Sequence, residues 1–186
     1  MTDRSKKNIL ELTHCTIGEY RQLHKLPLRL MADNVRSAQN VGSMLRTADA
    51  FLVAEMVMAG ISPVPPSPEI SKTALGAELS VAWRHVPDAF EEVCRLKDEG
   101  VRVYVLEQTH NSVPLQQLRL PSLQEAPAGM LLVAGNEVSG VDQRIVDIAD
   151  AAVEIPMHGT KHSLNVSVSA GIALWEFYRQ LHEYIL

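Results

Sequence analysis

Residues 155–178, with the sequence IPMHGTKHSLNVSVSAGIALWEFY, predict a strand end, a polar loop and a long helix in succession. The loop contains glycine, lysine and histidine, and it delivers Ser163 and Asn165 to the start of the helix. Both residue types cap helices or bind nearby backbone groups, so the helix is predicted to begin near residue 164. Taken alone, the stretch has two interpretations. It is either an ordinary capped helix or a polar functional site at the amino-terminal end of a helix.

Strands and helices alternate along the chain before this stretch. Apolar runs predict strands at residues 28–33, 53–60, 81–86, 101–108, 130–137 and 151–157. Helical patterns follow at 41–51, 87–100, 142–149 and 164–184, and a proline-rich loop lies at 62–70. Several strands are apolar throughout, which is typical of a parallel sheet covered by helices on both faces. The fold class is therefore predicted to be α/β.

The two ends of the chain differ in character. The last helix carries an apolar side made of Val168, Ile172, Trp175 and Tyr178. Residues 8–24 predict helical segments broken near Cys15, with Thr16 capping a second piece that contains Tyr20. We interpret residues 1–27 as a short helical appendage and residues 28–186 as the main domain.

Length and composition indicate one folded domain, because 186 residues with 46% hydrophobic content suffice for one core. The amino terminus lacks the apolar centre of a secretory signal, and no apolar run approaches the roughly 18 residues of a spanning helix. We therefore expect a cytoplasmic protein with no membrane partner. Cys15 and Cys94 lie far apart without a CxxC pattern and are predicted to be buried thiols.

Charge is distributed unevenly along the chain, whose net charge is −5. Residues 1–46 hold eight Lys and Arg against four Asp and Glu, whereas the remainder holds 9 against 18. A locally basic surface on an otherwise acidic protein is consistent with binding a polyanion at one site. A solvated charged end explains the same pattern equally well.

Polar loops follow three of the predicted strands. They begin at Asp33-Asn34, at Gly135-Asn136-Glu137 and at residue 157. Ligands of open α/β sheets lie beyond the carboxyl ends of the strands, so a site is predicted where these loops meet. A glycine such as Gly135 also lets a ligand approach the backbone closely.

Individual polar residues in these loops have two readings each. Asn40 and Arg46 are about 600° apart on a helix, roughly 120° away from a common face. In one interpretation, the Asn40 amide positions a substrate and the Arg46 guanidinium binds phosphate. In the other, the segment is a capped helix with a solvated arginine. Glu137 either accepts hydrogen bonds that brace its loop or takes part in catalysis.

The sequence motifs of several other kinds of functional site are missing. Neither GxGxxG, GxxxxGK[ST] nor GxSxG occurs in the chain. His158 and His162 have the spacing of helical metal ligands, but Gly159 argues against a helix there and no acidic third ligand is adjacent. No metal site is predicted.

Three segments together resemble a known family. NVRSAQNVGSMLRTADAF (34–51), LLVAGNEVSGV (131–141) and IPMHGTKHSLNVSVSAGIALWEFYR (155–179) are similar, in this order, to the three motifs of the SpoU/TrmH family of RNA 2′-O-ribose methyltransferases, within the SPOUT superfamily. The resemblance extends from about residue 28 to residue 178 and includes TALGAE at 73–78. It implies a parallel α/β sheet whose carboxy-terminal part forms a deep trefoil knot, and a homodimer.

The resemblance also implies S-adenosylmethionine as the methyl donor, held by backbone groups of the second and third motif loops. By motif position, Gly135, Ile155 and Leu164 correspond to the family's cofactor contacts. Residues 106–108, from Leu106 to Gln108 at the end of another predicted strand, are expected from topology to complete the wall of the pocket.

The family's catalytic set corresponds here to Asn40, Arg46, Glu137, Ser163 and Asn165. A guanidinium is a poor base because its pKa exceeds about 12, so Arg46 is expected to bind the phosphate beside the reacting hydroxyl. The other four residues are expected to orient the ribose and the loops.

RNA is the implied substrate, either tRNA or rRNA. The expected phosphate contacts are basic residues of the first part of the chain, namely Arg4, Lys6, Lys7, Arg21, Lys25, Arg29 and Arg36. Residues 1–27 could instead support the dimer. Two other functions stay open: a non-catalytic knotted RNA-binding protein in ribosome assembly, and a methyltransferase that acts on a base or a small molecule.

Overall fold

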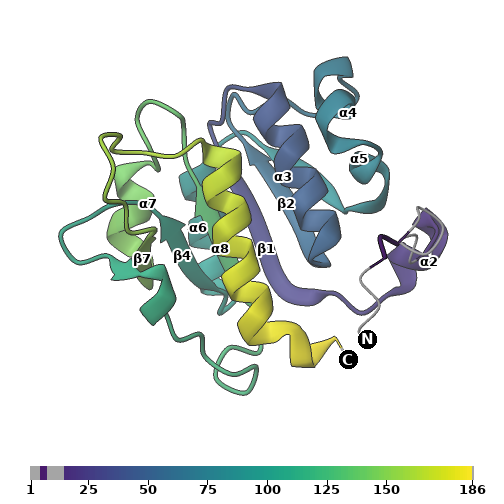
Figure 1. Cartoon of the computed structure of the whole chain (residues 1–186). Coiled ribbons are helices and arrows are strands. Elements are labelled where there is room, and N and C mark those ends of the chain that lie inside the picture. Colours follow the sequence, from purple (N-terminus) through teal and green to yellow (C-terminus); the bar gives the residue numbers. More distant parts are fainter. Residues whose placement is uncertain (1–4, 8–14, 186) are drawn as a thin grey trace.

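Seven parallel strands form one sheet in the computed structural model of the chain, which describes residues 5–7 and 15–185 (Figure 1). The strands are β1 (Leu26–Asp33), β2 (Val53–Ala59), β3 (Trp83–Val86), β4 (Arg102–Leu106), β5 (Val113–Pro114), β6 (Met130–Ala134) and β7 (Ala151–Glu154). Their order across the sheet is β3-β2-β1-β6-β4-β7-β5, and every neighbouring pair is parallel. The predicted α/β class is confirmed, and the knotted threading of the last segment stays a prediction.

Helices cover both faces of this sheet. On one face, α3 (Ala38–Ala50) packs against α4 (Pro68–Ala74), α5 (Ala77–Ser80) and α8 (Val166–Leu181). On the other face, α6 (Ala89–Asp98) packs against α7 (Gln143–Ile148). The other described helical segments are α2 (Ile17–Gln22) and the 3₁₀ turns η1 (Leu115–Gln117) and η2 (His182–Tyr184). Within residues 5–7 and 15–185, no helix has the length and apolar character that crossing a bilayer requires.

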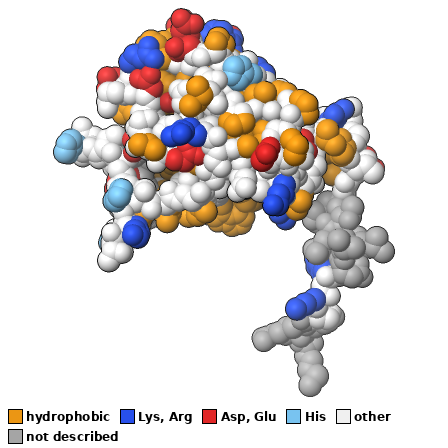
Figure 2. Space-filling view, turned by 90° about the horizontal axis from the view of Figure 1, so that it is seen from above, with side chains coloured by type: hydrophobic (Ala, Val, Ile, Leu, Met, Phe, Trp, Pro, Cys, Tyr) orange, Lys and Arg blue, Asp and Glu red, His pale blue; other side chains and the backbone are white. Residues whose placement is uncertain are grey.

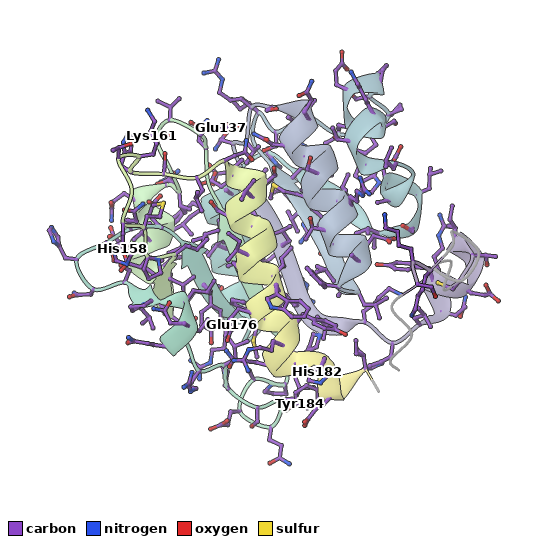
Figure 3. The ribbon with its side chains drawn as sticks, viewed as in Figure 1. Glu137, His158, Lys161, Glu176, His182 and Tyr184 are labelled. Atoms are coloured by element: carbon purple, nitrogen blue, oxygen red, sulfur yellow. The ribbon has the colours of Figure 1, made fainter. Side chains whose placement is uncertain are left out.

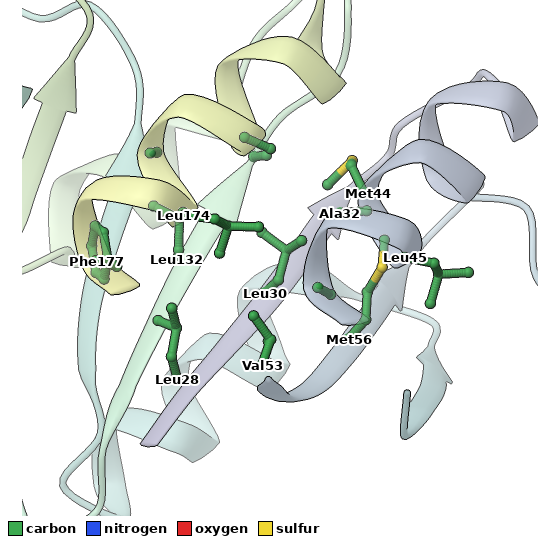
Figure 4. Close-up of a cluster of buried hydrophobic side chains, with 14 of the residues drawn as sticks. Leu28, Leu30, Ala32, Met44, Leu45, Val53, Met56, Leu132, Leu174 and Phe177 are labelled. Carbon is green, nitrogen blue, oxygen red and sulfur yellow. The ribbon is translucent and has the colours of Figure 1, made fainter. Parts of the chain in front are cut away.

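The alternation of side chains along β1 divides the core in two. Leu28 and Leu30 point into the cluster under α3 and α8, whereas Met31 points into the cluster under α6 and α7. Figure 4 shows the first cluster, in which side chains of β1 and β6 meet Leu45 of α3 and Phe177 of α8. Each fully buried side chain of this size contributes about 1.5–3 kcal/mol relative to exposure. This burial fixes the strands whose ends carry the polar loops.

Two short helices replace part of the expected proline-rich loop and the segment after it. Ser67 caps α4 by accepting a hydrogen bond from the Ile70 N–H, and Pro68 occupies the first turn. The helix ends because Leu75 has a left-handed backbone with φ of 53°. The prediction of a loop was therefore wrong from residue 68 onward, since the proline that marks a break also starts helices well.

The last helix begins later than predicted and buries a different side. Its cap is Asn165, whose Oδ1 accepts hydrogen bonds from Ser167 N at 2.9 Å and Val168 N at 3.3 Å. The residues buried against the sheet are Ala170, Ala173, Leu174, Phe177 and Leu181. The predicted apolar side is largely on the surface, with Val168, Ile172 and Trp175 exposed by 51%, 40% and 53%.

The described part of the amino-terminal segment is joined to the main body. Thr16 caps α2 as predicted, in a capping box in which Thr16 N donates to Glu19 at 2.7 Å. Tyr20 is 5% exposed and belongs to the larger core cluster, and α2 packs against α5. The predicted helix over residues 8–14 lies outside the described residues. Cys15 and Cys94, which were predicted to be buried thiols, are free thiols of intermediate burial.

Candidate active site

A cavity of about 770 Å³ lies at the carboxyl ends of β4, β6 and β7. The loops that follow these strands form its walls, as the position of ligand sites in parallel sheets predicts. All of the predicted cofactor contacts line it, namely Leu106, Gly135, Ile155 and Leu164. Three predicted catalytic residues, Glu137, Ser163 and Asn165, also lie in its wall. These predicted residues, taken from loops far apart in the sequence, therefore lie together around one cavity.

Gly135 is required for a reason that the sequence did not suggest. The expectation was that a residue without Cβ lets a ligand approach. In the structure, a Cβ at this position would lie 2.2 Å from the backbone of both Gly140 and Val141. The loop after β6 folds back on itself through backbone bonds between Asn136 and Gly140, at 2.9 and 3.0 Å, and this fold leaves no room for a side chain. Gly135 thus shapes the pocket wall itself.

A polar cluster made of Asn40, Glu137 and Asn165 joins the three motif loops beside the cavity. The amide of Asn40 donates to Glu137 Oε1 at 2.9 Å, and the amide of Asn165 donates to Asn40 Oδ1 at 3.0 Å. Glu137 also accepts hydrogen bonds from the backbone N–H groups of Arg36 and Ser37, at 3.0 and 3.2 Å. Figure 3 shows Glu137 near the start of α8, with Lys161 and His158 farther out on the third loop.

The environment of Glu137 keeps it ionised. Burial alone raises its pKa, but the hydrogen bonds from Arg36 N–H, the Asn40 amide and Ser37 N–H outweigh burial. The pKa of Glu137 therefore lies below its ordinary value. At neutral pH this carboxylate accepts hydrogen bonds and holds the first motif against the second, which supports the bracing reading over that of a general base.

The remaining two predicted catalytic residues stand apart from the cluster. Ser163 lines the cavity but does not cap α8, because Asn165 fills that role. Arg46 is exposed on α3, and its guanidinium has no hydrogen bond or ion pair within the described residues. The structure thus brings Asn40, Glu137 and Asn165 together in one chain and leaves Arg46 free on the surface.

Three of the seven predicted phosphate contacts are occupied by the protein itself, whereas Lys6 and Lys7 are exposed. The Arg21 guanidinium donates to Leu79 O at 2.6 Å, and the Lys25 ammonium binds two carbonyl oxygens and lies 4.2 Å from the Tyr20 ring centroid. Arg29 donates to a backbone carbonyl at 3.3 Å and lies 3.8 Å from a Glu55 oxygen. The Arg36 side chain is exposed without such a partner in the described part, and Arg4 lies outside it.

Among the described residues, the basic side chains at the end of the molecule that holds the cavity do not form one patch (Figure 2). Figure 2 looks down on this end and shows Lys and Arg side chains scattered among apolar and neutral ones. A polyanion that binds here therefore meets separate cations rather than a continuous basic surface.

Two polar residues of the expected wall segment 106–108, which had no individual role in the prediction, connect the loops of the pocket. Glu107 Oε2 accepts a hydrogen bond from Val141 N at 3.1 Å, and Gln108 Nε2 donates to His162 O at 2.7 Å. The loop after β4 is thereby tied to both other loops of the pocket. The available signal was the position of Glu107, which directly follows an apolar strand as Glu137 does.

Asp33, at the end of β1, also connects two loops by a hydrogen bond. It is almost fully buried, and its Oδ2 accepts a hydrogen bond from Asp142 N at 2.9 Å. Burial raises the pKa of Asp33, although the hydrogen bonds from Asp142 N–H and the Asn34 amide oppose this. The carboxylate fixes the first motif loop to the residue where α7 begins.

Comparison with known proteins agrees with this geometry. The SpoU rRNA Methylase family matches residues 27–175. The chain belongs to this family. The 23S rRNA (guanosine-2'-O-)-methyltransferase RlmB of Vibrio vulnificus (strain CMCP6) is 32% identical over 159 residues, which cover 84% of this chain and 61% of that protein. The chain thus spans less than two thirds of the length of that relative.

Two solved structures of similar fold carry related descriptions. The A. aeolicus TrmH/SpoU tRNA modifying enzyme has a TM-score of 0.77 at 28% identity, over 90% of this chain and 83% of that one. The AdoMet-bound rRNA methyltransferase from Sinorhizobium meliloti has a TM-score of 0.75 at 26% identity, over 87% and 60%.

The cavity wall has the composition that S-adenosylmethionine requires. Leu106, Val153, Ile155 and Leu164 supply apolar surface for an adenine ring, and loop backbone supplies polar groups. The lining glutamates would provide negative charge for a sulfonium, and no Lys or Arg stands among the described lining residues. The residues present therefore fit this cofactor. In the described part of the chain, no group of His, Cys, Asp and Glu is arranged to hold a metal ion.

Proposed function

We propose that this chain is an S-adenosylmethionine-dependent methyltransferase that methylates a ribose 2′-hydroxyl in rRNA or tRNA. The observation that carries the proposal is the cluster of Asn40, Glu137 and Asn165 at the edge of the cavity. It gathers residues from three motifs, separated by up to 125 positions, beside the cofactor pocket. Membership in the SpoU family and the similarity to a guanosine-2'-O-methyltransferase support the same reaction.

Each residue of the site has a role that its geometry permits. The cofactor supplies an electrophilic methyl group on a sulfonium. Leu106, Ile155 and Leu164 would hold its apolar part, and Gly135 shapes the loop that would enclose it. The amides of Asn40 and Asn165 and the hydroxyl of Ser163 orient the ribose, while Glu137 keeps the loops in place. These residues supply the proximity that methyl transfer needs.

Arg46 binds the phosphate beside the reacting ribose. Its guanidinium is exposed and has no protein partner among the described residues, as a phosphate ligand in the free protein should be. A bound arginine lowers the pKa of a neighbouring hydroxyl by favouring the anion, and it stays charged throughout. Arg36, at the head of α3, is the second free cation that we assign to RNA.

The working form is a homodimer joined through the exposed apolar side of α8. Val168, Ile172 and Trp175 form a patch on one side of this helix, and Trp175 extends it through Phe51, with ring centroids 5.8 Å apart. A contiguous apolar surface of this kind is typical of a protein contact. A second copy of the chain offers the same surface and so matches it by two-fold symmetry.

Methyl transfer to RNA tests the proposed function and the role of Arg46 together. Purified protein is incubated with tritiated S-adenosylmethionine and with tRNA or rRNA from a strain that lacks this protein. The modified atom is then mapped. We expect a 2′-O-methyl group in one RNA class, and Arg46→Ala should lower the rate at least about a hundredfold because phosphate binding is lost.

The cofactor affinity of the variant is the control, measured by calorimetry. It should stay within about twofold of wild type, because Arg46 does not line the cavity. A methyl group on a base or a small molecule, or no transfer despite cofactor binding, would contradict the proposal.

A further inference from the structure

The charged side chains of the cavity wall are nearly all of one sign. Among the described residues that line it, three are glutamates, Glu107, Glu137 and Glu154, and His162 is the one ionisable base. S-adenosylmethionine carries a positive sulfonium in addition to its amino-acid charges, whereas the demethylated product carries a neutral thioether. A carboxylate fixed near the ligand therefore distinguishes donor from product by charge.

Of the three glutamates, Glu107 has the position best defined for distinguishing the charged donor from the neutral product. Its Oε1 accepts a hydrogen bond from Gln108 N at 2.9 Å and its Oε2 accepts one from Val141 N at 3.1 Å. The same oxygen lies so close to Gly140 that a Cβ there would approach it to 2.1 Å. The carboxylate is thus held between the loop after β4 and the loop after β6, both of which form the cavity.

The other two glutamates are less suited. Glu137 directs its carboxylate to three donors of the first motif, Arg36 N, Ser37 N and the Asn40 amide. Glu154 ends β7 beside the edge strand β5, and no hydrogen bond orients its carboxylate within the described residues. Glu107 alone combines a place in the cavity wall with a carboxylate that two pocket loops hold in position.

We propose that Glu107 makes the pocket prefer the cationic methyl donor to the neutral product. This inference rests on the proposed function, since it assumes that the cavity holds S-adenosylmethionine. The preference favours loading by the donor and release of S-adenosylhomocysteine after transfer. Glu107 is a specificity-determining residue in this scheme, and the residues that orient the ribose are unchanged.

The test measures the dissociation constants of S-adenosylmethionine and S-adenosylhomocysteine by calorimetry with the full chain. Wild type is compared with Glu107→Gln, which removes the charge, and with Glu107→Asp, which keeps it. The matched control is Glu125→Gln. Glu125 also accepts a backbone hydrogen bond, from Ser122 N at 2.9 Å, but it lies outside this cavity.

The readout is the ratio of the two constants, product over donor. A disturbed loop, or an effect of the charge on the amino-acid group that both ligands share, changes both constants alike and leaves this ratio unchanged. Loss of a charge that acts on the sulfonium weakens the donor more than the product and lowers the ratio. We expect Glu107→Gln to lower the ratio about fivefold to tenfold, the size of one nearby charge at intermediate dielectric. Glu107→Asp and Glu125→Gln should keep the wild-type ratio.

Two results overturn the inference, and they differ. If Glu107→Gln weakens both ligands in proportion, or neither, Glu107 is only a brace and the proposed function stands. If wild type binds neither ligand, the cavity does not hold this cofactor, and the proposed function fails as well.

Discussion

The loop after β6 depends on a single glycine, whose replacement has a clear steric consequence. In Gly135→Ala, the new methyl group would lie 2.2 Å from backbone atoms of Gly140 and Val141, which cannot move as a flexible side chain would. We expect a loss of about 1–3 kcal/mol in the free energy of unfolding, together with weakened cofactor binding. Urea denaturation and calorimetry measure the two effects.

Gly159→Ala is the matched control, because nothing lies within 4 Å of a Cβ at Gly159. Its stability should stay within about 0.5 kcal/mol of wild type. Equal stability of the two variants would show that the loop after β6 does not fold over Gly135 as described.

The depressed pKa of Glu137 predicts how stability depends on pH. A carboxyl whose folded pKa is lowered stabilises the fold above its unfolded value, 4.5, and this contribution is lost as pH falls through the folded pKa. The difference in unfolding free energy between wild type and Glu137→Gln should therefore be largest at neutral pH and shrink below pH 4.5. The exposed Glu91, changed to Gln, serves as the control. A difference that grows on acidification would refute the bracing role.

At the level of elements, the two sides of α8 face different surroundings. Ala170, Leu174 and Phe177 pack against the sheet, while Ile172 and Trp175 are half-exposed. In Ile172→Asp, a charge would enter the proposed dimer contact but would stay solvated in a single protomer. We expect the variant to be a folded monomer, by sedimentation and circular dichroism, where wild type is a dimer.

The control is Glu183→Lys, because Glu183 is exposed. Gln180 is avoided as a control position because its side chain forms hydrogen bonds with Leu118 and Leu120. Glu183→Lys places a charge change beyond the patch and should leave the dimer intact. A monomeric wild type, or a dimer that tolerates Ile172→Asp, would exclude this contact.

The element pattern also shows what the sequence could and could not predict. The alternation of strands and helices was predictable because strands buried on both faces are apolar throughout, as in β6. The pocket was predictable because polar loops follow those strands. The apolar side of α8 was not, since periodicity marks an apolar side without saying whether the sheet or a second protein covers it. The partners of Arg21 and Arg29 are distant carbonyl and carboxylate groups, which local sequence does not reveal. Lys25 binds nearby carbonyl groups, those of Tyr20 and Leu23, but only the folded backbone brings them to its ammonium.

On the scale of the whole molecule, Tyr20 joins the amino-terminal segment to the core. Its ring is buried, burial raises its pKa, and its hydroxyl has no hydrogen-bond partner in the described part of the chain. We expect Tyr20→Ala to cost about 3–5 kcal/mol of unfolding free energy, as for other large buried side chains. Tyr20→Phe keeps the ring and removes only the unpaired hydroxyl, so it should be within about 1 kcal/mol of wild type.

Thermal and urea denaturation distinguish two descriptions of this segment. An appendage that leaves the main domain independent predicts little effect from Tyr20→Ala. A segment that completes the core predicts the large loss, and the place of Tyr20 in the core cluster supports the second description.

The sheet order has a consequence for how the protein is made. β1 lies between β2 and β6, and Leu28 pairs with Met130. During synthesis, one edge of β1 therefore stays unpaired until about a hundred further residues have left the ribosome. The sheet can form on that side only after β6 emerges. Nascent chains that stop short of β6 should expose an apolar edge and attract chaperones, so translation speed through the middle of the message should influence yield.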